Sequence, residues 1–290
     1  MAAEVSRAHR VGLAWRPELA AGILANLDRI AVVEVLADNY FKASRRERDA
    51  LRALASQVPV QLHGVGLGLA SSYAVDTAWL DRMARLIEHV RPAGWSEHLA
   101  FVRAGGVEIR HLAMPPRTAY TVEQTVQNVA TARAITGSTP ALENIATLFD
   151  PSMSTLTEAQ WTRQILDGAS APMLLDLHNL YANAVNAGRD PLADLAAFPL
   201  ERVRCVHLSG GKWISHHGGE RRLLDDHVHS PPDAVFELLR VLESRTAAGF
   251  DVVLERDGHY PAFAVLLEEL DRARAALNSR SAQVPERQYA

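Results

Sequence analysis

The segment VRCVHLSG, residues Val203–Gly210, shows the pattern that decides the fold. A short apolar run ends in a histidine, His207, and a serine and glycines follow it. Side chains of a β-strand alternate between its two faces, so Cys205 and His207 share a face. The segment therefore predicts a buried strand whose last inward side chain is a potential metal ligand.

Segments of this kind recur along the chain, separated by longer amphipathic segments. Typical helix patterns are Thr77–Val90 and Asp233–Arg245, in which apolar residues recur on one stripe. The predicted strands are Arg10–Trp15, Ala31–Ala37, Val58–Gly64, Gly94–Ala100, Pro140–Ala146, Pro172–Asn179, Val203–Gly210 and Phe250–Gly258. Strands that alternate with helices indicate an α/β protein with a parallel sheet. Eight such units predict a (β/α)8 TIM barrel, for which about 250 residues is typical.

Composition is that of an ordinary soluble globular protein, with 48% hydrophobic and 22% charged residues. The net charge of −4 gives no electrostatic case for nucleic acid as a partner. No run approaches the roughly 18 apolar residues of a membrane span, and the first residues lack the apolar stretch of a signal peptide. The single cysteine excludes an internal disulfide and fits a reducing compartment. We predict a cytoplasmic protein with one TIM-barrel domain, residues 1–278, and a disordered tail, residues 279–290.

Metal-binding side chains stand at the ends of most of these strands, where the active sites of TIM barrels lie. The predicted ligands at strand ends are His63, His98, Glu143, Asp176, His207 and Glu255, and the long loop after His207 adds Asp225 and His227. So many inward carboxylates would repel one another without cations between them. Imidazoles mixed with carboxylates suit iron, manganese or catalytic zinc, and the size of the set provides for two or three ions.

Neighbouring polar residues leave alternatives at several strand ends. Next to His98, Glu97 is expected to face the helix layer or to support the ligands from behind. Asn144 could orient the carboxylate of Glu143, which is able to bridge two cations. Glu34, inside the second strand, fits a buried partner of an arginine as well as a site residue.

The sixth strand carries two polar residues that alternation places on one face, Asp176 and His178. His178 is therefore predicted to reach the barrel mouth and to bind the outermost metal or contact the substrate. The alternative is a structural hydrogen bond to a loop carbonyl.

The loop Ser209–Ser230 is too long for an ordinary connection and predicts a flap that carries ligands. Asp226 or His229 could replace Asp225 or His227 as ligands. Five further histidines are expected to be exposed structural residues: His9, His89, His111, His216 and His217.

Two further features are interpreted as structural. Cys205 is predicted to be a small buried residue of the barrel interior. The glycine-rich segment Gly64–Gly68 lacks the spacing of the known nucleotide-binding loops. We expect its glycines to let the backbone turn close to a crowded centre.

These motifs together resemble the multinuclear non-heme iron-dependent oxidative enzymes, a family of MbnB-like TIM barrels. The resemblance rests on EVLADNYF (Glu34–Phe41), HGVGLGL (His63–Leu69), SEHL (Ser96–Leu99), LEN (Leu142–Asn144), LLDLHNLYANAVN (Leu174–Asn186), HLSG (His207–Gly210), LDDH (Leu224–His227) and ERD (Glu255–Asp257). Each motif alone is weak, but they stand in the family's order and cover nearly the whole chain. The resemblance implies that the eight predicted ligands hold iron, with Glu143 as a bridge, and that Asp176, His178 and Glu143 are catalytic.

The resemblance also implies an activity. Members of the family oxidise residues, often cysteine, in ribosomally synthesised precursor peptides (RiPPs), with dioxygen as co-substrate and two or three non-heme iron ions. They commonly work with a separate protein that binds the leader peptide. The chain departs from the family at His178, where relatives often have asparagine, and at Asp226, where a small hydroxyl residue is usual.

Two alternatives remain from the residues alone. A zinc- or manganese-dependent hydrolase or isomerase, of the xylose isomerase or endonuclease-IV-like barrel type, would use a very similar ligand set. A DNA-repair version should have a basic groove, against which 30 basic and 34 acidic residues argue. A non-catalytic metal-binding or adaptor protein would leave the open coordination positions unused.

Overall fold

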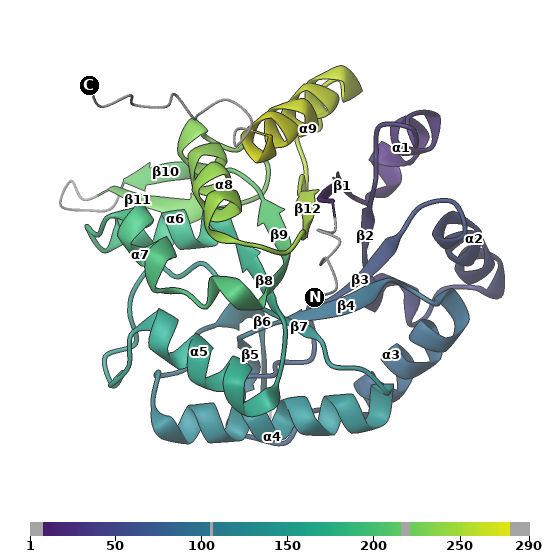
Figure 1. Ribbon diagram of the computed structural model, residues 1–290. Helices are drawn as coiled ribbons and strands as arrows, with labels where there is room; N and C mark the ends of the chain where they lie inside the picture. Colours follow the sequence, from purple (N-terminus) through teal and green to yellow (C-terminus); the bar gives the residue numbers. More distant parts are fainter. Residues whose placement is uncertain (1–7, 105–106, 216–220, 279–290) are drawn as a thin grey trace, which may run out of the picture.

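The computed structural model describes residues 8–104, 107–215 and 221–278, and within them eight parallel strands form a closed barrel (Figure 1). These strands are β1 (Arg10–Ala14), β2 (Val33–Leu36), β3 (Val60–Gly64), β4 (Gly94–His98), β7 (Ala141–Glu143), β8 (Met173–Asp176), β9 (Val203–Leu208) and β12 (Asp251–Leu254). They follow one another around the barrel in chain order, and β12 closes it against β1. The predicted TIM barrel is confirmed, with strands shorter than predicted. The predicted disordered tail lies outside the described residues.

Helices cover the outside of the barrel (Figure 1). They are α1 (Ala20–Ala25), α2 (Arg45–Ala55), α3 (Thr77–Val90), α4 (Ala119–Thr136), α5 (Glu158–Ala169), α6 (Leu177–Asn186), α7 (Pro191–Ala197), α8 (Asp233–Arg245) and α9 (Phe263–Leu277), with 3-10 turns at Pro17–Leu19, Ala37–Tyr40 and Leu200–Arg202. The bounds predicted for α3 and α8 are confirmed. Within the described ranges, no helix combines the length and apolarity needed to cross a bilayer.

Two antiparallel hairpins extend the chain beyond the barrel strands. β5 (Phe101–Ala104) pairs with β6 (Val107–Ala113), and β10 (Gly211–Ser215) pairs with β11 (Arg221–Asp225). Much of the predicted ligand-bearing flap is therefore a regular hairpin, and the predicted ligand Asp225 is the last residue of β11. His216 and His217, which were expected to be exposed, lie outside the described residues.

Apolar side chains fill both the helix layer and the lower part of the barrel. On α3, the stripe Leu80, Met83 and Leu86 is at most 2% exposed. Inside the barrel, a cluster of buried residues forms one layer: Ala14, Val32, Leu174, Cys205 and Val253. The predicted burial of Cys205 in this layer is confirmed. The predicted ligands lie toward the strand ends from this layer, and at its other side Arg10 and Gln61 donate hydrogen bonds to the buried Asp251.

Candidate metal centre

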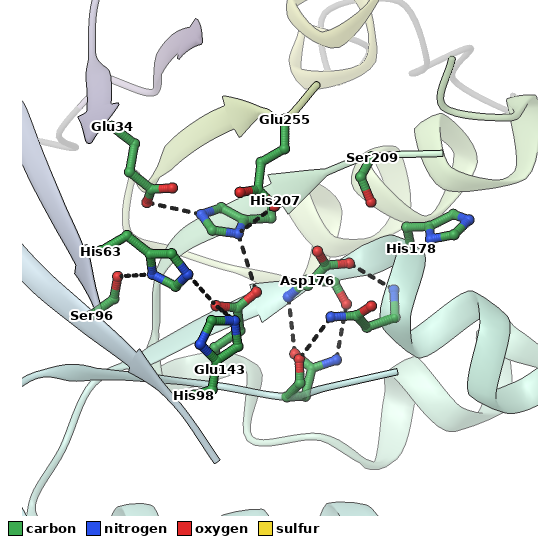
Figure 2. Close-up of polar contacts among 12 residues, drawn as sticks. Glu34, His63, Ser96, His98, Glu143, Asp176, His178, His207, Ser209 and Glu255 are labelled. Atoms are coloured by element: carbon green, nitrogen blue, oxygen red, sulfur yellow. Dashed lines mark hydrogen bonds and ion pairs between the residues drawn. The ribbon is translucent and has the colours of Figure 1, made fainter. Parts of the chain in front are cut away.

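Six predicted ligands from six different strand ends point toward one another (Figure 2). All are buried, with at most 8% of each residue exposed. They are His63, His98, Glu143, Asp176, His207 and Glu255. Five stand inside strands β3, β4, β7, β8 and β9, and Glu255 directly follows β12. Strand alternation and the closed barrel therefore bring them to one place.

A first group of candidate ligands consists of His63, His98 and Glu143. Its two histidines face one carboxylate oxygen of Glu143. The Nε2 atoms of His63 and His98 each lie 3.3 Å from the Oε2 of Glu143. Potential ligand atoms of these residues lie within 4.8 Å of one another. A cation could therefore be held between two imidazoles and a carboxylate.

A second group of candidate ligands consists of Glu143, Asp176, His207 and Glu255. It contains the other carboxylate oxygen of Glu143. The Nδ1 of His207 lies 3.1 Å from the Oε1 of Glu143 and 3.1 Å from the Oε2 of Glu255. Asp176 completes this group, whose potential ligand atoms also lie within 4.8 Å of one another. Because its two oxygens face different groups, Glu143 has the geometry of a bridging ligand.

Asp225 and His227 stand next to the second group. The Nε2 of His227 lies 2.8 Å from the Oδ2 of Asp225, and its Nδ1 lies 3.6 Å from the Oε2 of Glu255. Both residues are half-buried, and His227 has a left-handed backbone with φ +54°. The structure thus brings all eight predicted ligands together, while their binding of metal remains a prediction.

Three histidines hold a partner on the ring nitrogen that faces away from these groups. The Nδ1 of His63 lies 2.7 Å from the hydroxyl of Ser96, and the Nδ1 of His98 lies 3.2 Å from the carbonyl of Gly64. The Nε2 of His207 lies 2.9 Å from the Oε2 of Glu34. Metal-binding histidines in proteins are usually oriented in this way. Glu34 is therefore a neighbour of the site rather than a simple partner of an arginine.

Two carboxylate oxygens in the centre are buried without a hydrogen bond from any described residue. They are the Oε2 of Glu143 and the Oδ2 of Asp176. The other oxygen of Asp176 accepts the N–H of Asn179 at 2.7 Å, at the start of α6. The Oε2 of Glu143 has only its ion pairs with His63 and His98 at 3.3 Å, and a cation among these atoms would stabilise the buried carboxylates. The donor set and these oxygens therefore fit a metal centre.

Protons balance the charge of the centre when metal is absent. Burial lowers the pKa of His98, but Glu143 and Glu97 outweigh it and raise that pKa to about 9. Burial, followed by the carboxylates of Asp225 and Glu143, raises the pKa of Asp176 well above its ordinary value. Metal ligands bind as neutral imidazole and as carboxylate, so metal would displace these protons.

His178 has a different place from the one predicted. The strand ends at Asp176, which caps α6, and α6 begins at Leu177, so the strand alternation used for His178 is wrong. The His178 ring is fully buried, and its Nδ1 lies 2.8 Å from the Oδ1 of Asp225. Its partner is thus a predicted ligand rather than a loop carbonyl. This geometry favours a role in positioning Asp225.

Three polar residues near the centre hydrogen-bond to groups other than the predicted ligand atoms. They are Asp226, His229 and Asn144. Asp226 and His229 contact each other at 2.8 Å, so Asp225 and His227 are the pair that reaches the centre. Asn144 does not orient Glu143. Its side chain bonds both the N–H and the carbonyl of Asp176, at 2.9 and 3.0 Å.

Glu97 lies behind the glycine-rich segment. It is fully buried, and its Oε2 accepts the N–H of Leu67 at 3.2 Å. A Cβ on Gly64 would lie 2.7 Å from that same oxygen, and Gly68 has φ +75°. Segment Gly64–Gly68 therefore turns tightly against a buried carboxylate, as expected, and the N–H groups of Val65 and Leu67 donate to Asp38 and Glu97.

Arg16 and Asn179 are site residues that the sequence analysis missed. Arg16 is buried beside Glu255 and Asp257, with its Nη2 2.5 Å from Asp257 and 4.0 Å from Glu255. The Oδ1 of Asn179 is buried without a hydrogen-bond partner in the described chain, and Asn179 lines the cavity beside the centre. The available signals were the position of Arg16 two residues after β1 and that of Asn179 three residues after Asp176.

A cavity of about 390 Å³ opens beside the centre. His98, Glu143, Asp225 and His227 line one side of it. His111, expected to be only an exposed residue, is also part of its wall. A volume in this range is typical of small-ligand sites. A larger cavity of about 560 Å³ near Glu158 contains none of the predicted ligands.

Comparisons with known proteins identify relatives in several bacteria. A UPF0276 protein of Streptomyces avermitilis is 34% identical over 276 residues, and the match covers 92% of this chain but only 54% of that relative. The chain thus spans about half the length of that protein. A UPF0276 protein of Rhizorhabdus wittichii is 31% identical, with 85% of this chain and 86% of the relative covered.

Solved structures with a similar fold include a sugar epimerase and a xylose isomerase domain protein. The apo 3-keto-D-glucoside 4-epimerase of E. coli matches with a TM-score of 0.58 and 14% identity, covering 92% of this chain and 99% of that one. A xylose isomerase domain protein of Salmonella typhimurium matches with a TM-score of 0.59 and 15% identity, covering 92% and 97%. At such low identity the likeness shows the TIM-barrel fold alone.

One family model matches residues 10–278, nearly all of the described barrel. Its description is RiPP precursor modification enzyme MbnB/TglH/ChrH. The match contains every residue of the centre described above. The chain therefore belongs to the MbnB/TglH/ChrH family of RiPP precursor modification enzymes.

Proposed function

We propose that this protein uses iron and dioxygen to oxidise a residue, expected to be cysteine, in a ribosomally synthesised precursor peptide. The observation that carries the proposal is Glu143, whose two oxygens face two different groups of buried imidazoles and carboxylates. A carboxylate in this position suits a centre of more than one metal ion. Membership of a family of RiPP-modifying enzymes supports a peptide as the substrate.

Bound iron would supply the one-electron chemistry that dioxygen activation requires, with open positions for a substrate thiolate. One ion would be held by His63, His98 and Glu143, and a second by Glu143, Asp176, His207 and Glu255. Asp225 and His227 would hold a third ion or complete the second site.

The surrounding side chains would keep the ligands in place. Ser96, the Gly64 carbonyl and Glu34 fix the rotation of three imidazole rings, so little reorganisation is needed when metal enters. The guanidinium of Arg16 offsets the negative charge of Glu255 and Asp257. Ligands this deeply buried limit the access of water to the reacting atoms.

Iron content and dioxygen-dependent turnover test the proposal. Protein purified without air should hold two or three iron ions per chain. It should then change the mass of a cysteine-containing precursor peptide encoded beside its gene, and only when dioxygen is admitted. Stoichiometric zinc with activity retained in the absence of dioxygen would contradict the proposal and favour a hydrolase or isomerase.

A separate leader-binding protein is part of the proposal, because related enzymes commonly use one. Turnover of the full precursor should then rise when the candidate partner protein is added, while turnover of a peptide without the leader should not change. Equal turnover of both peptides with and without that protein would remove the partner from the proposal.

A further inference from the structure

The cavity beside the metal centre is built mostly from apolar side chains of three segments. β6 contributes Leu112, the segment after β7 contributes Ile145 and Leu148, and β11 contributes Leu224. These segments are far apart in the sequence and meet only at the barrel mouth. The cavity therefore forms only in the folded barrel, and the hairpins β5–β6 and β10–β11 supply part of its wall.

Apolar side chains also continue outward from the cavity. Leu148 is 41% exposed and Phe149 is 76% exposed, although both line the cavity. Large apolar groups on a surface commonly mark a binding site. Their position at the rim indicates that the occupant passes over them on its way to the centre.

Charged groups of the described wall are confined to the side of the metal ligands. Among the described lining residues there is no lysine or arginine, and the acidic ones are Glu143 and Asp225. Away from the side formed by His98 and His227, an anionic side chain would find no cationic partner among the described lining residues. The remaining wall offers chiefly dispersion contacts and burial to an occupant.

We propose that this cavity receives a large apolar side chain of the substrate peptide, from a residue next to the one that is modified. The inference rests on the proposed function, because the ligands His98, Glu143, Asp225 and His227 form the inner wall of the same cavity. A residue whose neighbour fills the hollow is held within reach of those ligands. Leucine, methionine or phenylalanine fits the wall, whereas aspartate or glutamate does not.

Short peptides with matched neighbours of cysteine test this subsite. The probes are acetylated and amidated Gly-Leu-Cys-Leu-Gly, Gly-Gly-Cys-Gly-Gly and Gly-Asp-Cys-Asp-Gly, titrated calorimetrically into iron-loaded protein without air. The leucine peptide should bind about tenfold more tightly than the glycine peptide, as burial of one leucine side chain predicts. The aspartate peptide should bind most weakly. Equal affinities of the leucine and glycine peptides, or no measurable binding of any peptide, would overturn the inference.

A matched pair of exposed leucines separates the cavity from general surface effects. Leu148→Asn changes a rim residue that is 41% exposed, and Leu192→Asn changes one on α7 that is 39% exposed and outside the cavity. Leu148→Asn should reduce the preference for leucine by about threefold or more, because part of the apolar wall is lost. Leu192→Asn should leave the preference unchanged. Equal effects of the two variants would contradict the inference.

The peptide Gly-Leu-Ser-Leu-Gly distinguishes a failure of the subsite from a failure of the proposed function. If serine peptides keep the leucine preference while no cysteine peptide is oxidised with dioxygen, the subsite stands and the proposed function fails. If cysteine peptides are oxidised equally well with leucine or glycine neighbours, the function stands and the subsite inference is wrong.

Discussion

The barrel interior has two layers, and the same strands build both. On five of the strands, an apolar or thiol side chain in the lower layer is followed two residues later, on the same face, by a candidate ligand or its partner. The pairs are Val32 and Glu34, Ala141 and Glu143, Leu174 and Asp176, Cys205 and His207, and Val253 and Glu255. These apolar residues pack as an ordinary core, whereas β3 and β4 carry Gln61 and Ser96 two residues before their ligands. The upper layer brings carboxylates and imidazoles into a buried space, which costs stability unless cations balance them.

The two layers should therefore respond in opposite ways to substitution. Substitutions in the lower layer should lower the free energy of unfolding and leave the metal content unchanged. Substitutions in the upper layer should lower the metal content and the enzymatic activity. The same argument sets the order of the expected effects.

Glu143→Gln should have the largest effect. It removes the negative charge that both ligand groups share, so iron content should fall well below that of the natural protein and peptide turnover should fall to background. Elemental analysis and mass spectrometry measure the two quantities. Glu158→Gln, which changes a glutamate outside the centre, is the matched control and should keep its iron. Full iron content in the Glu143 variant would show that the site is misplaced.

Leu174→Ala should cost about 2–5 kcal/mol in the free energy of unfolding, because it leaves a cavity in a fully buried layer. Iron content per folded chain should stay the same. Chemical denaturation of the metal-free protein gives the stability, and Leu192→Ala on the surface serves as control. Loss of iron at unchanged stability would contradict the separation of the two layers.

Glu34→Gln should weaken metal binding about tenfold, because it removes the charge that orients His207 from outside the ligand set. Competition with a chelator of known affinity measures the change. The fold should be intact, since the amide oxygen can still accept a hydrogen bond from His207. An unchanged affinity would mean that Glu34 only fills space.

Replacement of Glu158 should have the smallest effect, which is a change in how the stability of the protein depends on pH. Burial raises the pKa of Glu158 to about 7, although Arg117 and Asn183 oppose the shift. The folded chain then binds this proton more tightly than the unfolded chain, so stability falls as pH rises from about 4.5 to about 7 and stays lower above. Glu158→Gln should gain roughly 2–4 °C in Tm over the natural protein on going from pH 5 to pH 8. A Tm difference that is the same at both pH values would argue against this carboxyl.

Much of the upper layer could be predicted because strand alternation is a local property. His63, Glu143 and His207 each end a short apolar run, and the barrel closure then brings such ends together. His178 could not be placed in this way. LLDLHN reads as a continued strand, yet Asp176 accepts the N–H of Asn179 and starts a helix. The choice between strand and helix there depends on contacts with distant segments.

Contacts between distant residues explain the remaining gaps. Glu34 and His207 are 173 residues apart, and nothing near either residue signals their hydrogen bond. The length of the segment Ser209–Ser230 predicted a flap, but no local pattern indicated that Gly211 pairs with Asp225 in the hairpin β10–β11. The strands specify the ligands, whereas their orientation comes from tertiary contacts.

The central claim is that the upper layer is a centre of more than one metal ion with Glu143 as a shared ligand. Anomalous X-ray diffraction at the iron edge, on crystals grown without air, tests it most directly. At least two iron peaks should appear, one between His63, His98 and Glu143 and one beside Asp176, His207 and Glu255. A single peak, or iron peaks away from Glu143, would contradict it.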